Sequence, residues 1–214
     1  MAEPGRDAVV FDLGGVLVDW NPRHLYRKLF PGDEAAMEHF LATVCTSEWH
    51  RHHDAGRTYA EGARLLKAGH PDMGELIDAF GARQEEMIAG AIHETVTVLK
   101  ELHGRGVPLY ALSNWPAEGF PSTRRRFDFL GCFRGILISG EVGVIKPDPR
   151  IFEMLIEIHA IDPARTAFID DSEANVAAAR PFGFNATRFT DAAALRFELA
   201  GLGLLPAQMT PDSS

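Results

Sequence analysis

Short apolar runs that end at glycine or polar residues recur along the chain. They span residues 8–13, 107–112, 135–138 and 166–169. Runs of this length, closed by such residues, are typical of strands that are buried inside a parallel sheet. The pattern therefore predicts four buried strands, each followed by a loop.

Helical patterns separate these predicted strands. Residues 94–103 and 151–159 carry apolar side chains at helical spacing, and residues 173–180 are rich in alanine. Strands that alternate with helices indicate an α/β fold, here a Rossmann-like parallel sheet flanked by helices. In such sheets ligands bind beyond the carboxyl ends of the strands, so we expect the functional residues there.

The stretch from about residue 19 to residue 91 has a different pattern. It contains no convincing strand, whereas residues 33–44 repeat apolar side chains along one helical face. Thr58 and Glu61 fit a capping box at the start of another helix. Residues 72–88 show a further helical pattern, which two glycines weaken.

This pattern predicts an all-helical cap that is inserted after the first strand and covers the site. We assign residues 18–92 to the cap and residues 1–17 and 93–205 to a Rossmann-like catalytic core. Residues 206–214 are expected to form a flexible tail, because they are polar and lie at the chain end.

The charge and cysteine content narrow the classes of partner. Hydrophobic residues make up 46% of the chain and charged residues 24%, as in ordinary globular proteins, but the net charge is −9. An acidic chain argues against nucleic acid or a membrane as the main partner, because both bind basic surfaces. Two cysteines do not provide a disulfide framework, and the first residues lack a signal-peptide pattern, so we expect a cytoplasmic protein.

Four polar motifs lie at or near the ends of the predicted strands. They read Phe11-Asp12-Leu13-Gly14-Gly15, Leu112-Ser113-Asn114, Lys146-Pro147-Asp148-Pro149 and Phe168-Ile169-Asp170-Asp171-Ser172. In their order, spacing and placement they resemble the four motifs of the haloacid dehalogenase-like hydrolases. The resemblance extends from Val9 to about Thr190, and the Asp-Leu-Gly start is similar to that of helical-cap members that include sugar-phosphate phosphatases.

The chemistry of these residues suits phosphoryl transfer. An aspartate at a strand end is a competent nucleophile if a cation holds its charge and its line of attack is open. Phosphoryl transfer spreads negative charge over oxygen atoms, so catalysis depends mainly on positioning and on charge stabilisation. Mg²⁺ binds oxygen ligands, which Asp12 and Asp170 would supply.

The resemblance implies a role for each motif residue. Asp12 would be the nucleophile that forms an aspartyl-phosphate, and Asp12, the carbonyl of Gly14 and Asp170 would hold Mg²⁺. Asp171, also assigned to the metal site, would hold a metal-bound water or orient Lys146. Lys146 would neutralise the charge around Asp12 and the phosphate. Ser113, with the backbone N–H of Asn114, would bind a phosphate oxygen. The implied activity is a Mg²⁺-dependent phosphatase that acts on a small phosphorylated metabolite such as a sugar phosphate, as a monomer or homodimer.

The same residues also fit structural roles. An aspartate after a strand commonly caps the next turn or helix, which applies to Asp12 and to the Asp170-Asp171 pair. Ser113 fits a turn, and Lys146 fits a solvated surface position. Two adjacent acids, however, are costly to pack without a cation, which favours a metal site.

Gly14 departs from the usual pattern of the phosphatases. Most of them carry a second aspartate there, which protonates the leaving group, and glycine cannot do this. A haloacid dehalogenase, which would use Asp12 to form an ester intermediate, needs no such acid because a halide leaves without a proton. Against this alternative, dehalogenases place a carboxylate about where Asn175 stands, and they need no paired acids such as Asp170-Asp171. A catalytically weak binding protein is the third interpretation, supported by Gly14 alone.

The cap segment 49–57 is rich in polar and aromatic residues. We expect Trp49 to pack on the substrate and Asp54 or Arg57 to bind its hydroxyl groups, although a hydrated helix end fits equally well. A histidine of this segment, His50, His52 or His53, is a candidate for the missing acid. The same three histidines with Asp54 would be the ligands of a zinc site, but their spacing fits no common zinc pattern.

Two tryptophans follow the first and second motifs. Trp20 and Trp115 either narrow the mouth of the site, with Trp115 touching the substrate, or pack at the joint between cap and core.

Overall fold

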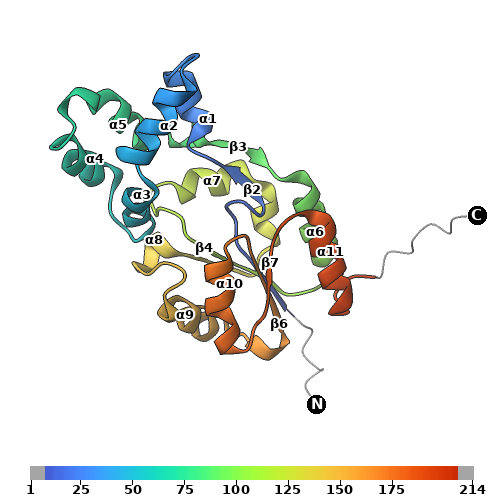
Figure 1. Ribbon diagram of the computed structural model, residues 1–214. Helices are drawn as coiled ribbons and strands as arrows, with labels where there is room; N and C mark the ends of the chain where they lie inside the picture. The colour runs from blue at the N-terminus through green and yellow to red at the C-terminus, as the bar shows by residue number, and fades with distance from the viewer. Residues whose placement is uncertain (1–7, 207–214) are drawn as a thin grey trace, which may run out of the picture.

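The computed structural model describes residues 8–206 of the 214-residue chain. Five parallel strands form one sheet in the order β5-β4-β1-β6-β7 (Figure 1). The strands are β1 (Ala8–Phe11), β4 (Leu109–Ser113), β5 (Gly135–Ile138), β6 (Thr166–Asp170) and β7 (Asn185–Arg188). The predicted α/β fold with a Rossmann-like sheet is confirmed, and the first four of these strands coincide with the four apolar runs.

The fifth strand, β7, was not predicted from the apolar pattern. Its sequence is Asn-Ala-Thr-Arg, and both ends of the strand are exposed. β7 is an edge strand that pairs only with β6, so it needs no continuous apolar run. A polar edge strand of this kind leaves little signal in the sequence.

Helices cover both faces of the sheet (Figure 1). They are α6 (His93–Gly104), α7 (Phe120–Arg126), α8 (Ser139–Val142), α9 (Pro149–His159), α10 (Glu173–Ala179) and α11 (Ala192–Gly201). Val9 and Phe11 of β1 are buried against α6, α7 and α11, whereas Val10 is buried against α9 and α10. Side chains that alternate between two apolar layers explain why β1 reads as a continuous apolar run.

Five helices lie between residues 20 and 88 and have an apolar core of their own. They are α1 (Arg23–Leu29), α2 (Glu34–Thr43), α3 (Ser47–Asp54), α4 (Tyr59–Lys67) and α5 (Gly74–Ala82). The Thr58 hydroxyl accepts the backbone N–H of Glu61 at 3.2 Å and so caps α4, as the sequence indicated. α5 is shorter than the 72–88 pattern, because 3₁₀ turns flank it at Pro71–Met73 and Gln84–Met87.

The expectation that this segment contains no strand is wrong at its two ends. β2 (Val18–Trp20) pairs antiparallel with β3 (Ile88–Ala91), so the chain enters and leaves the helical segment side by side. Strands of three and four residues are too short to show a period of two, and their partners are about 70 residues apart in the sequence. We call the helical part of this segment the cap and propose that it is a separate domain.

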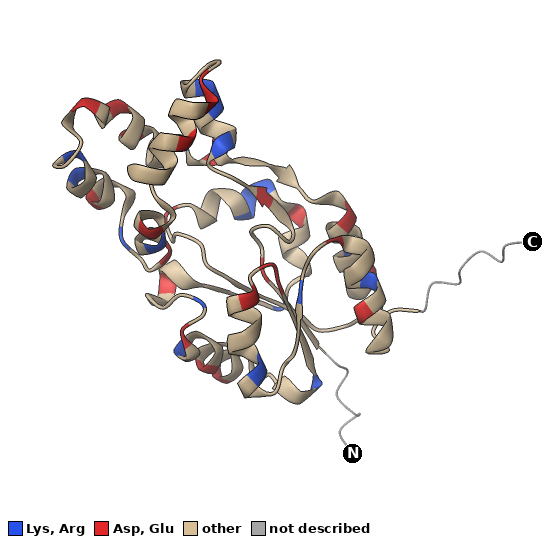
Figure 2. Ribbon diagram, in the orientation of Figure 1, with Lys and Arg blue, Asp and Glu red and all other residues tan. Residues whose placement is uncertain are grey.

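Charged residues of both signs occur in both parts of the described chain. Acidic and basic residues are interspersed along the ribbon of the cap and of the core (Figure 2). Within residues 8–206, no helix combines the length and the apolar character that a membrane crossing requires.

Candidate active site

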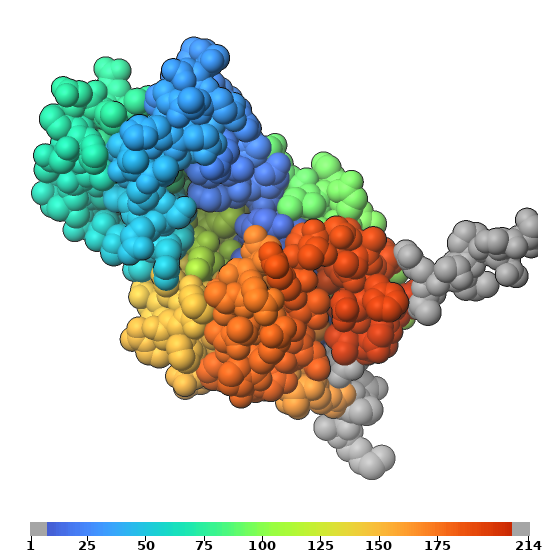
Figure 3. Space-filling view, in the orientation of Figure 1, coloured from blue at the N-terminus to red at the C-terminus, as the bar shows by residue number. Residues whose placement is uncertain are grey.

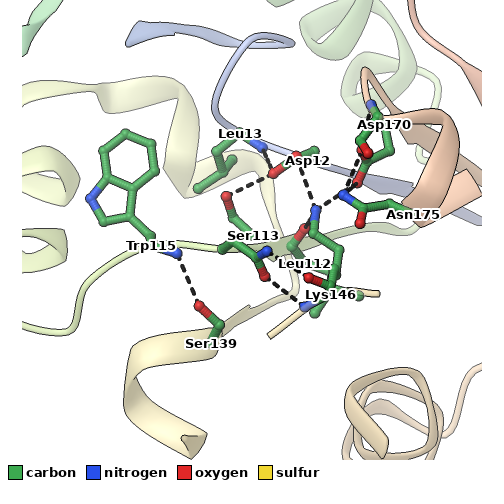
Figure 4. A network of polar contacts seen from close by, with 11 residues as sticks. Asp12, Leu13, Leu112, Ser113, Trp115, Ser139, Lys146, Asp170 and Asn175 are labelled. Atoms are coloured by element: carbon green, nitrogen blue, oxygen red, sulfur yellow. Dashed lines mark hydrogen bonds and ion pairs between the residues drawn. The ribbon is translucent and has the colours of Figure 1, made fainter. Parts of the chain in front are cut away.

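The three central strands bring the first, second and fourth motifs to one edge of the sheet. Asp12 directly follows β1, Ser113 is the last residue of β4, and Asp170 is the last residue of β6. Because β4, β1 and β6 are neighbours and parallel, their carboxyl ends lie together (Figure 4). Residues about 50 to 160 positions apart in the sequence therefore share one site.

Lys146 lies at the centre of this group. Its Nζ lies 2.9 Å from Oδ2 of Asp12 and 2.6 Å from Oδ2 of Asp170, and it donates a hydrogen bond to the carbonyl of Leu112 at 2.8 Å. Burial by itself would lower the pKa of Lys146, but the two carboxylates together raise it. The side chain therefore carries a positive charge between two negative ones, which excludes the solvated surface role.

Asn114 holds the backbone of this lysine. Its side-chain Oδ1 accepts the N–H of Lys146 at 2.8 Å, and its Nδ2 donates to the carbonyl of Lys146 at 3.0 Å. The sequence had pointed only to the backbone N–H of Asn114, as a phosphate ligand. Both polar groups of the Asn114 side chain instead join the second motif to the third, which positions Lys146.

The carboxylate of Asp12 is almost fully enclosed by hydrogen-bond donors. Its Oδ1 accepts the backbone N–H of Leu13 and the hydroxyl of Ser113, both at 2.7 Å, and Oδ2 faces Lys146. The residue is 7% exposed. Burial raises the pKa of Asp12 to about 7, against the opposing effects of Lys146 and Ser113, so a further cation nearby would help to keep it ionised.

Asp170 is buried, and an amide side chain orients it. Nδ2 of Asn175 donates to Oδ1 at 2.9 Å and to Oδ2 at 3.1 Å, and the N–H of Ser172 donates to Oδ1 at 2.9 Å. Asn175 stands about where a dehalogenase would carry a carboxylate. Its amide is already engaged in holding Asp170, on the first turns of α10.

Three carboxylates could hold a metal ion together. Asp12, Asp170 and Asp171 each offer one ligand atom, and these atoms all lie within 4.8 Å of one another. Burial and the neighbouring Asp170 raise the pKa of Asp171, whose side chain is partly open to solvent. A Cβ at Gly15, which has a φ of +73°, would lie 2.5 Å from Oδ2 of Asp171, so glycine is required here. Clustered oxygen ligands fit Mg²⁺.

The tryptophans occupy packing positions. Trp49 lies in the apolar core of the cap, where Nε1 donates to the carbonyl of Gly62 at 3.3 Å and the ring packs against Phe80. The structure therefore does not bring Trp49 to the site, contrary to expectation. Trp115 is 6% exposed and belongs to the apolar core of the catalytic part, as the packing alternative stated. Its ring lies 3.8 Å from where a Cβ of Gly14 would be.

The histidines of the cap segment are poor candidates for an acid. Burial lowers the pKa of His50 to about 3 and also lowers that of His53, whose Nδ1 pairs with the carbonyl of Arg57 at 3.1 Å. Both rings are therefore neutral near pH 7, and His52 is exposed. Among the described residues these histidines do not form a metal-ligand group with Asp54, so the zinc alternative has no support.

Asp54 and Arg57 differ in their placement. Asp54 ends α3 and is 6% exposed, and burial, with the charge of Asp12 adding to it, raises its pKa to about 7. Asp54 therefore lies close enough to Asp12 for the two charges to interact. Arg57 is half-buried, and its guanidinium forms no ion pair within the described part of the chain.

A cavity of about 490 Å³ lies inside the cap segment. Its apolar lining includes Trp20, Leu41, Cys45 and Phe80. The ring of His50 also lines the cavity and stacks on Trp20 at 4.8 Å, while Nε2 of His50 lies 3.4 Å from Oδ1 of Asp54. His50 therefore separates this cavity from Asp54. The molecular surface is hollowed where the cap, blue to teal, meets the core, yellow to orange (Figure 3).

Comparison with known proteins identifies relatives along most of the chain. A sesquiterpene phosphatase from Aspergillus oryzae is 28% identical over 205 residues, which cover 91% of this chain and 95% of that protein. A HAD family enzyme from Bacteroides thetaiotaomicron, solved as a magnesium complex, is 25% identical, covers 87% of this chain and 94% of its own, and superimposes with a TM-score of 0.66. The L-2-haloacid dehalogenase of Xanthobacter autotrophicus shares the fold, with 19% identity, 94% and 85% coverage, and a TM-score of 0.65.

The family assignment rests on a match that spans most of the chain. The family description "haloacid dehalogenase-like hydrolase" matches residues 6–183, which include all four motifs. The fold brings those motifs together around Asp12, with the third motif contributing Lys146. The chain belongs to the haloacid dehalogenase-like hydrolases.

Proposed function

We propose that this hydrolase is a Mg²⁺-dependent phosphatase that cleaves a small phosphate monoester through an aspartyl-phosphate on Asp12. The observation that carries the proposal is the group of three carboxylates beside a buried lysine. A site with this much negative charge favours a divalent cation, and a cation together with Lys146 favours an anionic substrate. The sesquiterpene phosphatase relative supports the same reaction.

Asp12, Asp170 and Asp171 would hold the metal ion, and the carbonyl of Gly14 is proposed as a further ligand. When bound, Mg²⁺ would neutralise charge on the phosphate oxygens and orient them. Asn175 would keep Asp170 in its orientation through the hydrogen bonds described above.

The residues around Asp12 suit its attack on phosphorus. One Asp12 oxygen would form a bond to phosphorus while the bond from phosphorus to the ester oxygen breaks. The Ser113 hydroxyl, which donates to Asp12 in this structure, would turn to a phosphate oxygen, where the N–H of Asn114 would also bind, and Lys146 would stabilise the added negative charge. Water would next attack phosphorus, releasing phosphate and the free Asp12 carboxylate.

The cavity in the cap segment is a candidate binding site for the leaving group of the substrate. A volume of about 490 Å³ is within the range of small-molecule sites, and its lining combines apolar side chains such as Leu41 and Phe80 with charged ones such as Arg23 and Glu38. The sequence motifs suggest a sugar phosphate, whereas the sesquiterpene phosphatase relative supports an alkyl or prenyl-type phosphate. We propose the alkyl or prenyl-type phosphate ahead of the sugar phosphate on this relative, and Asp54 and Arg57 remain proposed ligands for a polar group of the substrate.

The dehalogenase alternative is less well supported. Dehalogenation through an ester on Asp12 requires a base for the attacking water, and Asn175 carries no carboxylate and is engaged with Asp170. The structural likeness to a dehalogenase is a likeness of fold alone. The paired acids Asp170 and Asp171 beside Asp12 would have no cation to hold in a reaction that uses no metal.

Two parallel assays on one preparation test the proposal. We expect phosphate release from 4-nitrophenyl phosphate with Mg²⁺, loss of that activity with a chelator, and no halide release from 2-chloropropionate. Asp12→Asn should abolish phosphate release, because the amide is a poor nucleophile. The matched control is Asp19→Asn, which changes an exposed aspartate of β2 and should leave the rate unchanged. Metal-independent halide release would overturn the proposal.

A further inference from the structure

The proposed reaction lacks a group that can protonate the leaving oxygen. Gly14 has no side chain, and the ring of Trp115 lies beside the position where an aspartate side chain would begin. An alkoxide is a poor leaving group, so an acid near the ester oxygen is expected to accelerate its departure. His50 and His53 are neutral near pH 7, which leaves the cap carboxyl of Asp54 as the strongest candidate.

Asp54 is buried, yet one of its oxygens has no hydrogen-bond partner. The side chain is 8% exposed, and Oδ1 receives no hydrogen bond from any described residue. Nε2 of His50 lies 3.4 Å away, too far and poorly oriented for a good hydrogen bond. A buried carboxyl oxygen without a donor is costly, so it needs a functional or structural reason.

The position of Asp54 is held by the core. Oγ of Ser139 donates to the carbonyl of Asp54 at 2.7 Å and accepts the N–H of Trp115 at 3.0 Å. Figure 4 shows the bond between Ser139 and Trp115, which is two residues beyond Ser113. The same hydroxyl bonds to Asp54, so it links the end of α3 to the second motif. Gly56 allows the backbone after α3 to approach the core closely at this contact, because a Cβ at this position would lie 3.2 Å from the carbonyl oxygen of Gly140. The Asp54 backbone is therefore anchored beside the site.

We propose that Asp54 takes the place of the absent aspartate and acts as general acid and base for the leaving group. In the first step its carboxyl group gives its proton to the ester oxygen as that oxygen leaves phosphorus. In the second step the resulting carboxylate takes a proton from the water that attacks the aspartyl-phosphate, which restores the carboxyl group. The assignment rests on the phosphatase function proposed above.

The charged surroundings of Asp54 agree with this cycle. The groups that face it are Asp12 and Lys146 from the core, Arg51 and His50 on its own helix, and Tyr59 at the start of α4. Burial raises its pKa most, Asp12 raises it further, and Arg51 and Lys146 oppose the rise. A pKa of about 7 lets the group both give and accept a proton near neutral pH.

The test compares two substrates with different leaving groups in the wild type and in Asp54→Asn. 4-Nitrophenolate leaves without a proton, whereas the alkoxide of a primary alkyl phosphate such as hexyl phosphate needs one. We expect Asp54→Asn to lower kcat for hexyl phosphate by about 10²- to 10⁴-fold, with a much smaller effect on formation of the aspartyl-phosphate from 4-nitrophenyl phosphate. The wild-type rate with hexyl phosphate should fall as the pH rises through about 7, and the variant should lose this fall.

Matched variants separate chemistry from folding. Glu48→Gln changes an exposed carboxyl on the same helix and should behave like the wild type. Asp54→Glu keeps the acid and should retain more hexyl phosphate activity than Asp54→Asn.

Three outcomes would overturn the assignment. The first is an equal loss in the rate of aspartyl-phosphate formation from both substrates with an unchanged pH profile, which would make Asp54 a packing residue. The second is unchanged kcat for hexyl phosphate in Asp54→Asn. The third is a wild type that releases phosphate from neither ester, which would remove the proposed function and this inference with it. In the first two cases the phosphatase function stands.

Discussion

Lys146 shows how a single buried charge organises the site. Its ammonium group lies between Asp12 and Asp170, and its side chain is fully shielded from solvent. A buried cation next to two carboxylates stabilises their charged forms, whereas its removal would leave two negative groups close together. The lysine thus contributes both to stability and to the charge balance that a phosphate substrate requires.

We expect Lys146→Met to lower the free energy of unfolding by about 3–5 kcal/mol in metal-free buffer and to abolish phosphate release. Mg²⁺ should restore more stability to the variant than to the wild type, because it supplies positive charge at the same carboxylates. Denaturant unfolding with and without Mg²⁺ measures both effects. Lys28→Met, which changes an exposed lysine paired with Glu86, serves as the control and should alter stability little. An unaltered unfolding curve for Lys146→Met would contradict this account.

Among the secondary-structure elements, α3 of the cap and α8 of the core are in contact, and this contact positions the cap on the core. The strands β2 and β3 form the covalent joint, and the Ser139 hydroxyl forms a second link between cap and core. A buried hydroxyl that both donates and accepts is fully used, so its loss would leave two backbone groups without partners. The link therefore positions α3, and Asp54 with it.

Ser139→Ala should destabilise the protein by about 1–3 kcal/mol, because the carbonyl of Asp54 and the N–H of Trp115 lose their partner. It should also lower kcat for hexyl phosphate more than for 4-nitrophenyl phosphate, since the acid would be less well placed. The control is Ser122→Ala, which removes a half-buried hydroxyl that donates to the carbonyl of Gly119 and not to that of Asp54. Equal effects of the two substitutions would argue against a positioning role for Ser139.

For the whole molecule, burial of acidic groups makes stability depend on pH. The folded-state pKa values of Asp12 and Asp54 are both raised to about 7. A group whose pKa is raised on folding favours the folded state while it is protonated, and this benefit is lost as the pH rises through the folded-state value. Metal-free protein should therefore lose stability between about pH 4 and pH 7.

The contribution of Asp54 to this loss can be measured alone. We expect the free energy of unfolding of the wild type, relative to Asp54→Asn, to fall between about pH 4 and pH 7, in a chelator-containing buffer. One pKa unit corresponds to about 1.4 kcal/mol, so the fall should be a few kcal/mol at most. Urea unfolding at several pH values gives the difference directly. A difference that does not change with pH would show that the Asp54 pKa is not raised.

The local sequence pattern was sufficient to predict the fold class and to identify most of the motif residues. Strand-end residues such as Asp12, Ser113 and Asp170 are recognisable because a short apolar run precedes each of them. Parallel strands then bring their carboxyl ends together whatever the length of the intervening chain. This is why residues so distant in the sequence could be assigned to one site, and why the family could be identified from them.

The sequence by itself thus determined the parallel sheet, the helical insertion and the acidic site around Asp12. Only the tertiary structure decided that Trp49 packs inside the cap, that Asn114 holds Lys146, and that Asp54 is buried beside the core. These roles depend on contacts between segments that are distant in the sequence, and the local pattern around a residue contains no information about such partners. The sequence pattern around a polar helix residue is the same whether its side chain faces water or a buried carboxylate. Only the packing of the cap on the core distinguishes these two environments.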